Sequence, residues 1–89
     1  MPRYYLSPNA RLAGEREGGV LLDVKRGKYY SLSHVGLHVV RGIQAGRNSE
    51  GIVTDIQAEY KQPRDRVARD VEAFLADLVS KQLCQVSGG

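Results

Sequence analysis

Two histidines four positions apart are the first residues of this sequence that suggest a chemical role. His34 and His38 would lie on one face of a helix, where both imidazoles can approach a metal ion. The chain has no HExxH motif and no third ligand beside them, so we expect no metal site and interpret them as surface or helix-end histidines. Cys84 is the single cysteine and has no nucleophile signature around it. We interpret it as a packed or partly exposed residue near the end of the last helix.

No serine, carboxylate or glycine lies in a catalytic or nucleotide-binding motif. The sequence has no Gly-x-Ser-x-Gly turn, and neither Gly18-Gly19 nor Gly88-Gly89 precedes a strand-to-helix phosphate loop. A small domain without such a constellation is expected not to be an enzyme and to need no cofactor.

Length and composition restrict the chain to one small domain. It has 89 residues, of which 42% are hydrophobic and 26% charged, as in an ordinary globular domain. No apolar run reaches the roughly 18 residues of a membrane helix, and the start of the chain lacks the apolar stretch of a secretory signal. A single cysteine excludes an internal disulfide. We therefore expect one domain over residues 1–89, without a membrane partner, in the reducing cytoplasm.

The N-terminal third has the pattern of three strands. Residues 20–24 and 29–32 are rich in β-branched, aliphatic and aromatic side chains, and Gly27 between them suits a tight hairpin turn. Residues 10–13 are a weaker candidate, joined to the next strand by a turn rich in glycine and charge. These short connections predict an antiparallel meander whose last strand, Lys28–Leu32, lies at an edge of the sheet.

From Ser33 onward the apolar residues recur at helical spacing. Ser33 can cap a first helix that ends at Gly46, Asn48 or Ser49 can start a second, and Pro63 suits the first turn of a third.

The third helix, expected over residues 64–82, is the most regular. Its apolar positions recur at three- and four-residue spacing, at Val67, Val71, Phe74, Leu75, Leu78 and Val79. Residues 85–89 are expected to be a tail outside a core of about residues 10–84. The expected fold class is α+β and winged-helix-like, a three-stranded antiparallel sheet followed by three helices.

Charge is distributed unevenly along the chain. Residues 1–48 hold eight Lys and Arg against three Asp and Glu, whereas residues 49–89 hold five against seven. In a winged helix the third helix would enter the DNA groove, and residues 64–82 balance four cations with four carboxylates. Those carboxylates would repel phosphates, so we expect no nucleic-acid partner and keep a DNA-binding regulator only as a third hypothesis.

An edge strand beside an amphipathic helix predicts a peptide-binding groove. An extended peptide can add its backbone to the open edge while alternate side chains enter the groove. Tyr30 and Leu32 share the face of the strand that we assign to the core, and Tyr29 and Ser31 share the other. Tyr29 is then the available aromatic residue, and the alternative is that it only covers the sheet.

The residues of this strand and of the last helix resemble the PqqD family. The similarity is carried by Gly19-Val20-Leu21-Leu22-Asp23, by Gly27-Lys28-Tyr29-Tyr30-Ser31-Leu32, and by Asp70-Val71 with Phe74-Leu75, and it spans roughly residues 10–84. These proteins are the peptide-recognition elements of pathways that make ribosomally synthesised, post-translationally modified peptides (RiPPs). The short chain with its Gly-x-Leu-Leu-Asp opening is most similar to the recognition half of a split lasso-peptide leader peptidase.

The resemblance implies a non-catalytic adaptor that captures the leader segment of a precursor peptide. The leader would lie antiparallel to the third strand, in the cleft beside the third helix, and a separate cysteine protease would cut it, with a cyclase as a further partner. Lasso leaders are commonly bound through a Tyr-x-x-Pro-type segment, which needs an apolar pocket for its tyrosine. The positions that the resemblance assigns to peptide binding are Lys28, Tyr29, Tyr30, Ser31, Leu32, Val67, Asp70, Val71 and Phe74.

Three of these positions can have a role other than peptide binding, and the function itself has a second interpretation. Val71 and Phe74 fit a core role as well as a contact role, and Asp70 fits an ion pair with Arg66 or Arg69 on its own helix. The same fold also serves a second hypothesis, a pyrroloquinoline-quinone-type (PQQ-type) peptide chaperone for a radical enzyme.

Overall fold

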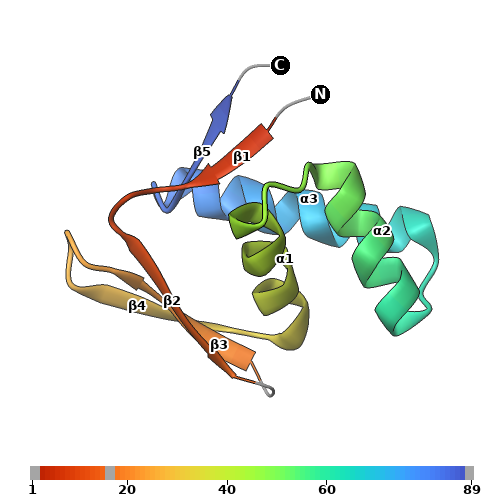
Figure 1. The fold of residues 1–89 in the computed structure, drawn as a ribbon, viewed down its shortest axis with the longest axis horizontal. Coiled ribbons are helices and arrows are strands. Elements are labelled where there is room, and N and C mark those ends of the chain that lie inside the picture. The colour runs from red at the N-terminus through yellow and green to blue at the C-terminus, as the bar shows by residue number, and fades with distance from the viewer. Residues whose placement is uncertain (1–2, 16–17, 88–89) are drawn as a thin grey trace.

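The computed structural model describes residues 3–15 and 18–87 and contains two sheets and three helices (Figure 1). In chain order the elements are β1 (Arg3–Leu6), β2 (Ala10–Glu15), β3 (Gly18–Asp23), β4 (Lys28–Leu32), α1 (His34–Gln44), α2 (Ser49–Tyr60), α3 (Arg64–Ser80) and β5 (Cys84–Ser87). The expected α+β class, with a three-stranded sheet followed by three helices, is confirmed. A small two-stranded sheet of β1 and β5 is added to it.

The three-stranded sheet is the predicted antiparallel meander. Its order is β2-β3-β4, so β4 is an edge strand as expected. Gly27 closes the β3–β4 turn with a φ of 67°, a backbone conformation that glycine adopts without a Cβ clash, and its N–H donates to the Asp23 carbonyl oxygen at 2.8 Å. The turn between β2 and β3 includes residues 16–17, which lie outside the described part of the chain.

The helix boundaries follow the predicted capping residues. The Ser33 hydroxyl accepts a hydrogen bond from the Gly36 N–H at 3.1 Å, and the Asn48 side chain accepts one from the Gly51 N–H at 2.8 Å. Pro63 is the residue that precedes α3 and does not belong to its first turn. α3 ends at Ser80, two residues earlier than expected.

The core lies where α1 meets the three-stranded sheet on one side and α2 with α3 on the other (Figure 1). Hydrophobic side chains from every helix and from both sheets are buried in it. Its fully buried large residues are Leu21, Val39, Val40, Ile52, Val71, Leu75 and Leu83. None of the helices in the described residues is long and apolar enough to cross a membrane.

The two-stranded sheet corrects the expectation for both ends of the chain. β5 pairs antiparallel with β1 over four residues, from Leu6↔Cys84 to Arg3↔Ser87, and Figure 1 shows the two strands side by side. The predicted tail is therefore wrong for residues 85–87, while residues 88–89 lie outside the described part. Cys84 belongs to this strand and not to the last helix. Strands of four residues carry too little local pattern to be recognised, and here the partner lies at the opposite end of the sequence.

Candidate functional site

The open edge of β4 is the first component of the candidate site. In the described part of the chain, β4 pairs only with β3. A Cβ atom on Gly18 would lie 2.6 Å from the carbonyl oxygen of Leu32, so this carbonyl points toward β3. The direction of the N–H and C=O groups alternates along an antiparallel strand. Tyr29 and Ser31 therefore direct their backbone groups away from β3, toward the open edge.

The side chains of β4 divide between two faces of the sheet as expected. Tyr30 is partly buried and Leu32 is 8% exposed, and both pack against the core. Tyr29 is 71% exposed, and Lys28 and Ser31 are also exposed. The expected division of the strand, with Tyr29 as its exposed aromatic side chain, is confirmed.

α3 lies beside β4 and the start of α1, as two contacts show. The ammonium nitrogen of Lys81, directly after α3, lies 5.5 Å from the centroid of the Tyr30 ring. The Phe74 ring lies against the first turn of α1, since a Cβ on Gly36 would be 3.3 Å from its Cζ atom. Tyr30 in β4 thus meets Lys81 at the end of α3, whereas Gly36, later in the chain, meets Phe74, which is earlier in α3. α3 is thus antiparallel to this segment and lies on the side of the sheet to which the Tyr30 ring points.

A hollow of about 400 Å³ lies near the beginning of α3, close to where β4 leads into α1. All three helices contribute to it. The lining residues are Val35, Ile56, Tyr60, Gln62, Arg66, Val67 and Asp70. Val67 and Asp70, two of the predicted positions, therefore come together in one concave surface.

The remaining predicted positions on α3 differ in accessibility. Val71 is fully buried, so its side chain belongs to the core of the free protein, whereas Phe74 is partly buried. Asp70 is exposed, and among the described residues it forms no ion pair with Arg66 or Arg69. The acidic side chain at the hollow is thus free to meet a ligand.

The part of the hollow that α2 and the residues after it provide could not be recognised from the sequence. In the sequence, Ile56 and Tyr60 are only two apolar positions at helical spacing in the second helix. Gln62 lies between two helices, where no periodicity marks a role. The partly exposed aromatic Tyr60 at a helix end was the one available signal, but its neighbours across the hollow come from other helices.

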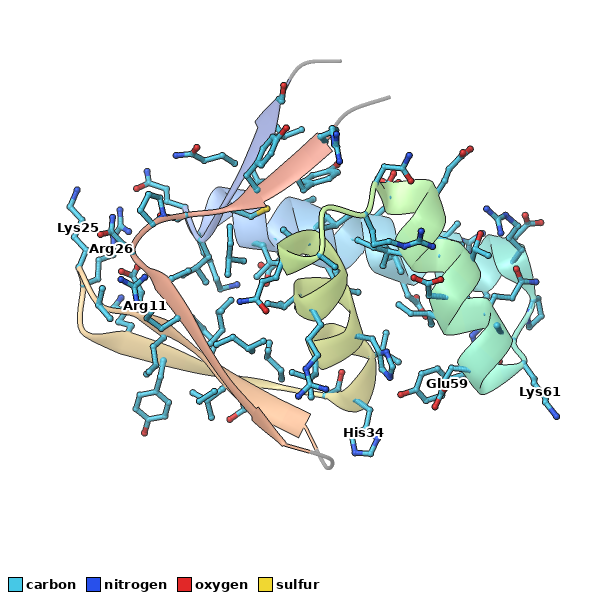
Figure 2. The ribbon with its side chains drawn as sticks, in the orientation of Figure 1. Arg11, Lys25, Arg26, His34, Glu59 and Lys61 are labelled. Carbon is cyan, nitrogen blue, oxygen red and sulfur yellow. The ribbon has the colours of Figure 1, made fainter. Side chains whose placement is uncertain are left out.

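The two histidines and the cysteine do not form a reactive site. His38 makes an edge-to-face contact with Tyr60, with ring centroids 5.7 Å apart, while His34 points outward at the start of α1 (Figure 2). Burial raises the pKa of the Cys84 thiol by more than its backbone hydrogen bonds with Tyr5 and Gln85 lower it, so the thiol stays protonated at neutral pH. The described residues include no group of side chains arranged to hold a metal ion.

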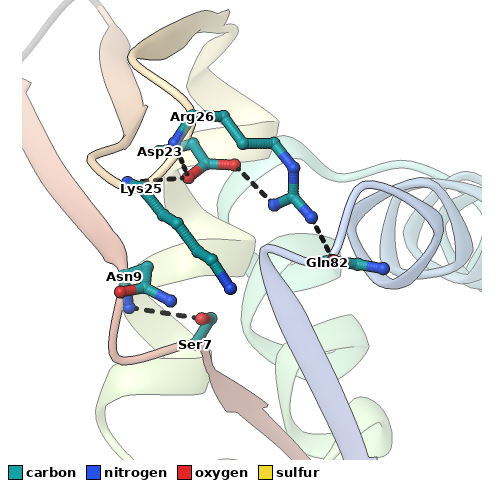
Figure 3. Close-up of polar contacts among 6 residues, drawn as sticks. All are labelled: Ser7, Asn9, Asp23, Lys25, Arg26 and Gln82. Atoms are coloured by element: carbon teal, nitrogen blue, oxygen red, sulfur yellow. Dashed lines mark hydrogen bonds and ion pairs between the residues drawn. The ribbon is translucent and has the colours of Figure 1, made fainter.

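A buried carboxylate holds the turn that leads into β4. The Asp23 side chain is 2% exposed and accepts hydrogen bonds from the backbone N–H groups of Lys25 and Arg26, each at 3.1 Å (Figure 3). The Arg26 guanidinium lies 3.0 Å from the same carboxylate and also donates to Gln82, after α3. Burial alone would raise the pKa of Asp23, but the bonds from Arg26 and Lys25 together lower it below its usual value. The ionised Asp23 thus fixes the start of β4 relative to the end of α3.

Comparisons with known proteins agree with this arrangement. A model of the family described as "Coenzyme PQQ synthesis protein D (PqqD)" matches residues 18–83. The solved structure "TbiB1 in Complex with the TbiA(beta) Leader Peptide" is similar at 32% sequence identity and a TM-score of 0.86, covering 96% of this chain and 99% of that chain.

A second solved structure supports the fold. It is described as "Lasso peptide synthetase B1 complexed with the leader peptide" and has 24% identity and a TM-score of 0.83, covering 93% of this chain and 98% of that one. The search of curated proteins gives no match.

The family match extends from the first residue of β3 through α3 to the turn before β5, and so includes the open edge and the hollow. The resemblance inferred from the sequence and the expectation that the chain is not an enzyme are confirmed by this match. The chain belongs to the PqqD family, whose recognition domains are non-catalytic peptide-binding proteins.

Proposed function

We propose that the chain binds the leader segment of a ribosomally synthesised precursor peptide as an additional strand on β4. The observation that carries this proposal is the open edge, where Tyr29 and Ser31 direct backbone N–H and C=O groups outward beside α3. A peptide antiparallel to β4 would use these groups and place alternate side chains toward α3. The similar TbiB1 structure, described as a complex with a leader peptide, supports a leader peptide as the ligand.

The hollow near the start of α3 fits one large side chain of that peptide. Val35, Ile56 and Val67 offer apolar contacts, while Arg66 and Asp70 offer polar partners. Such a site suits an aromatic ring that carries a hydroxyl group, because its body is apolar and its tip needs a hydrogen bond. The tyrosine of a Tyr-x-x-Pro-type leader segment has this chemistry. In an antiparallel peptide the N-terminal part lies at this end of β4.

The client that we favour is a lasso-peptide precursor. The Gly-x-Leu-Leu-Asp opening of β3 resembles the recognition half of a split lasso-peptide leader peptidase. The chain would hold the leader in the cytoplasm and present it to a separate peptidase of the cysteine-protease type and to a cyclase. The nine peptide-contact positions assigned from the resemblance are part of this proposal, with Val71 acting from within the core.

The second candidate is a peptide chaperone for coenzyme PQQ synthesis, which the description of the matching family favours. Its fold and mode of binding would be the same, and only the client peptide and the partner, a radical enzyme, would differ. A DNA-binding function has less support. α3 carries three Arg against four Asp and Glu, so the helix that would approach phosphates has a negative net charge.

Amide NMR tests the proposal directly. The labelled protein is titrated with the leader segment of the precursor peptide encoded beside its gene. We expect shifts concentrated in Lys28–Leu32 and along residues 67–78. A PQQ precursor peptide titrated in parallel separates the two candidates, and a spectrum that stays unperturbed at saturating leader peptide would rule out the leader-binding function for that client.

Tyr29→Ala is expected to weaken leader binding by roughly fivefold to tenfold, about 1 kcal/mol, without changing the free energy of unfolding. Tyr29 is 71% exposed, so its removal leaves no cavity in the free protein, whereas an added strand would lie next to its ring. Calorimetric titration and thermal unfolding measure the two effects. Tyr5→Ala is the matched control, because Tyr5 is 51% exposed in the other sheet. If Tyr29→Ala lowers the free energy of unfolding but leaves the leader affinity unchanged, Tyr29 has only a structural role in covering the surface of the sheet.

A further inference from the structure

A second hollow, of about 460 Å³, lies between the β3–β4 turn, the end of α3 and β5. Its polar lining comes from three segments that are distant in the sequence, residues 7–9, 25–26 and 82–85. These polar residues are Ser7, Asn9, Lys25, Arg26, Gln82 and Gln85. No Asp or Glu is among the residues that line it, so the concave surface has cations and amides without a carboxylate.

The side chains around this hollow supply more hydrogen-bond donors than the protein itself uses. Arg26 donates to Asp23 and to the side-chain oxygen of Gln82, which leaves the amide NH₂ of Gln82 available. The Lys25 ammonium forms no ion pair with any described residue, and Figure 3 shows its side chain extending toward Ser7 and Asn9. The Arg26 charge is paired with Asp23, so the donors without an anionic acceptor at this surface are the Lys25 ammonium and the Gln82 amide.

We propose that this hollow binds a side-chain carboxylate of the leader peptide, from the segment that follows the part paired with β4. The inference rests on the proposed function and extends it. A strand antiparallel to β4 leaves the sheet at Lys28, and its next residues pass the turn that holds Lys25 and Arg26. At about 3.3 Å per extended residue, an Asp or Glu some two to five positions further on can reach the hollow.

Calorimetric titration with the leader peptide tests this site. Each Asp or Glu in the following segment is replaced in turn by Asn or Gln, and each peptide is measured against the native protein and Lys25→Gln. We expect one peptide substitution to weaken binding to the native protein by about fivefold to tenfold. Lys25→Gln should lower the affinity for the native leader by the same factor. The peptide substitution and Lys25→Gln combined should lower the affinity no further than either change alone.

The design separates the site from general effects of charge and folding. Lys25→Gln keeps the backbone N–H that donates to Asp23, so the turn is preserved. Lys61→Gln removes the same charge at the opposite end of the molecule, as Figure 2 shows, and is expected to leave the affinity unchanged. Lys61 has a φ of 53°, a conformation that the chain already tolerates for glutamine at Gln82, with a φ of 61°.

Three outcomes would overturn the assignment of the hollow. The first is that the peptide substitution and Lys25→Gln lower the affinity independently of each other. The second is that Lys61→Gln lowers the affinity as much as Lys25→Gln does. The third is that the leader has no Asp or Glu in that segment. Leader-induced NMR shifts across Lys28–Leu32 would show in each case that strand addition itself stands. If these shifts are absent as well, the proposed function fails together with the site.

Discussion

Replacing Ser31 by proline is expected to lower the affinity for the leader peptide by at least about tenfold while the protein stays folded. The Ser31 N–H points to the open edge of β4, so proline removes a donor that an added strand would use. One such hydrogen bond contributes about 0.5–1.5 kcal/mol, and the proline ring also obstructs the approach of the peptide backbone. Calorimetric titration measures the loss, and circular dichroism verifies the fold.

Two further variants make the Ser31→Pro result specific. Ser31→Ala keeps the backbone donor and should bind as the native protein does. Tyr30→Pro removes an N–H that points toward β3, so it should lower the free energy of unfolding, because a ladder bond within the sheet is lost. A folded Ser31→Pro protein with native affinity would contradict strand addition on β4.

Ending the chain at Gln85 is expected to lower the free energy of unfolding by about 1–2 kcal/mol, although the sequence pattern marks these last residues as a tail. The truncation removes the Tyr4↔Val86 and Arg3↔Ser87 pairs. It also exposes Tyr4, which packs against the core, to more solvent. In a domain of this size the melting temperature should fall by roughly 5–15 °C. Thermal unfolding followed by circular dichroism measures the change.

A chain that ends at Ser87 is the matched control, because it keeps all four β1–β5 pairs and should melt like the full chain. Leader-induced NMR shifts across Lys28–Leu32 should remain in the folded truncated protein, since the two-stranded sheet does not include β4. An unchanged melting temperature in the chain ending at Gln85 would show that Val86 and Ser87 contribute nothing to stability.

Much of the fold was predictable because its information is local. Alternating and β-branched residues predicted β3 and β4, Gly27 marked their turn, and the capping side chains of Ser33 and Asn48 marked where two helices begin. These signals come from backbone preferences and hydrogen bonds within a few residues of each other. The open edge of β4 followed from the same reasoning, because two short turns leave the last strand of a meander at the side of its sheet.

The features that escaped prediction all depend on residues that are distant in the sequence. β1 and β5 are too short to show a period, and each becomes a strand only because folding brings the two ends of the chain together. The hollow near the start of α3 forms where three helices meet, so Gln62 carried no signal and Tyr60 only that of an aromatic residue at a helix end.

The local pattern of this chain was thus sufficient for its α+β class, its edge strand and its resemblance to peptide-recognition proteins. Tertiary packing decided which residues of the α3 stripe are accessible, since Val71 and Asp70 are neighbours in sequence but lie in the core and at the surface. It also brought Lys25, Arg26 and Gln82 together around the second hollow. Periodicity identifies the face of a helix that is apolar, but only the packed neighbours determine how far that face is covered.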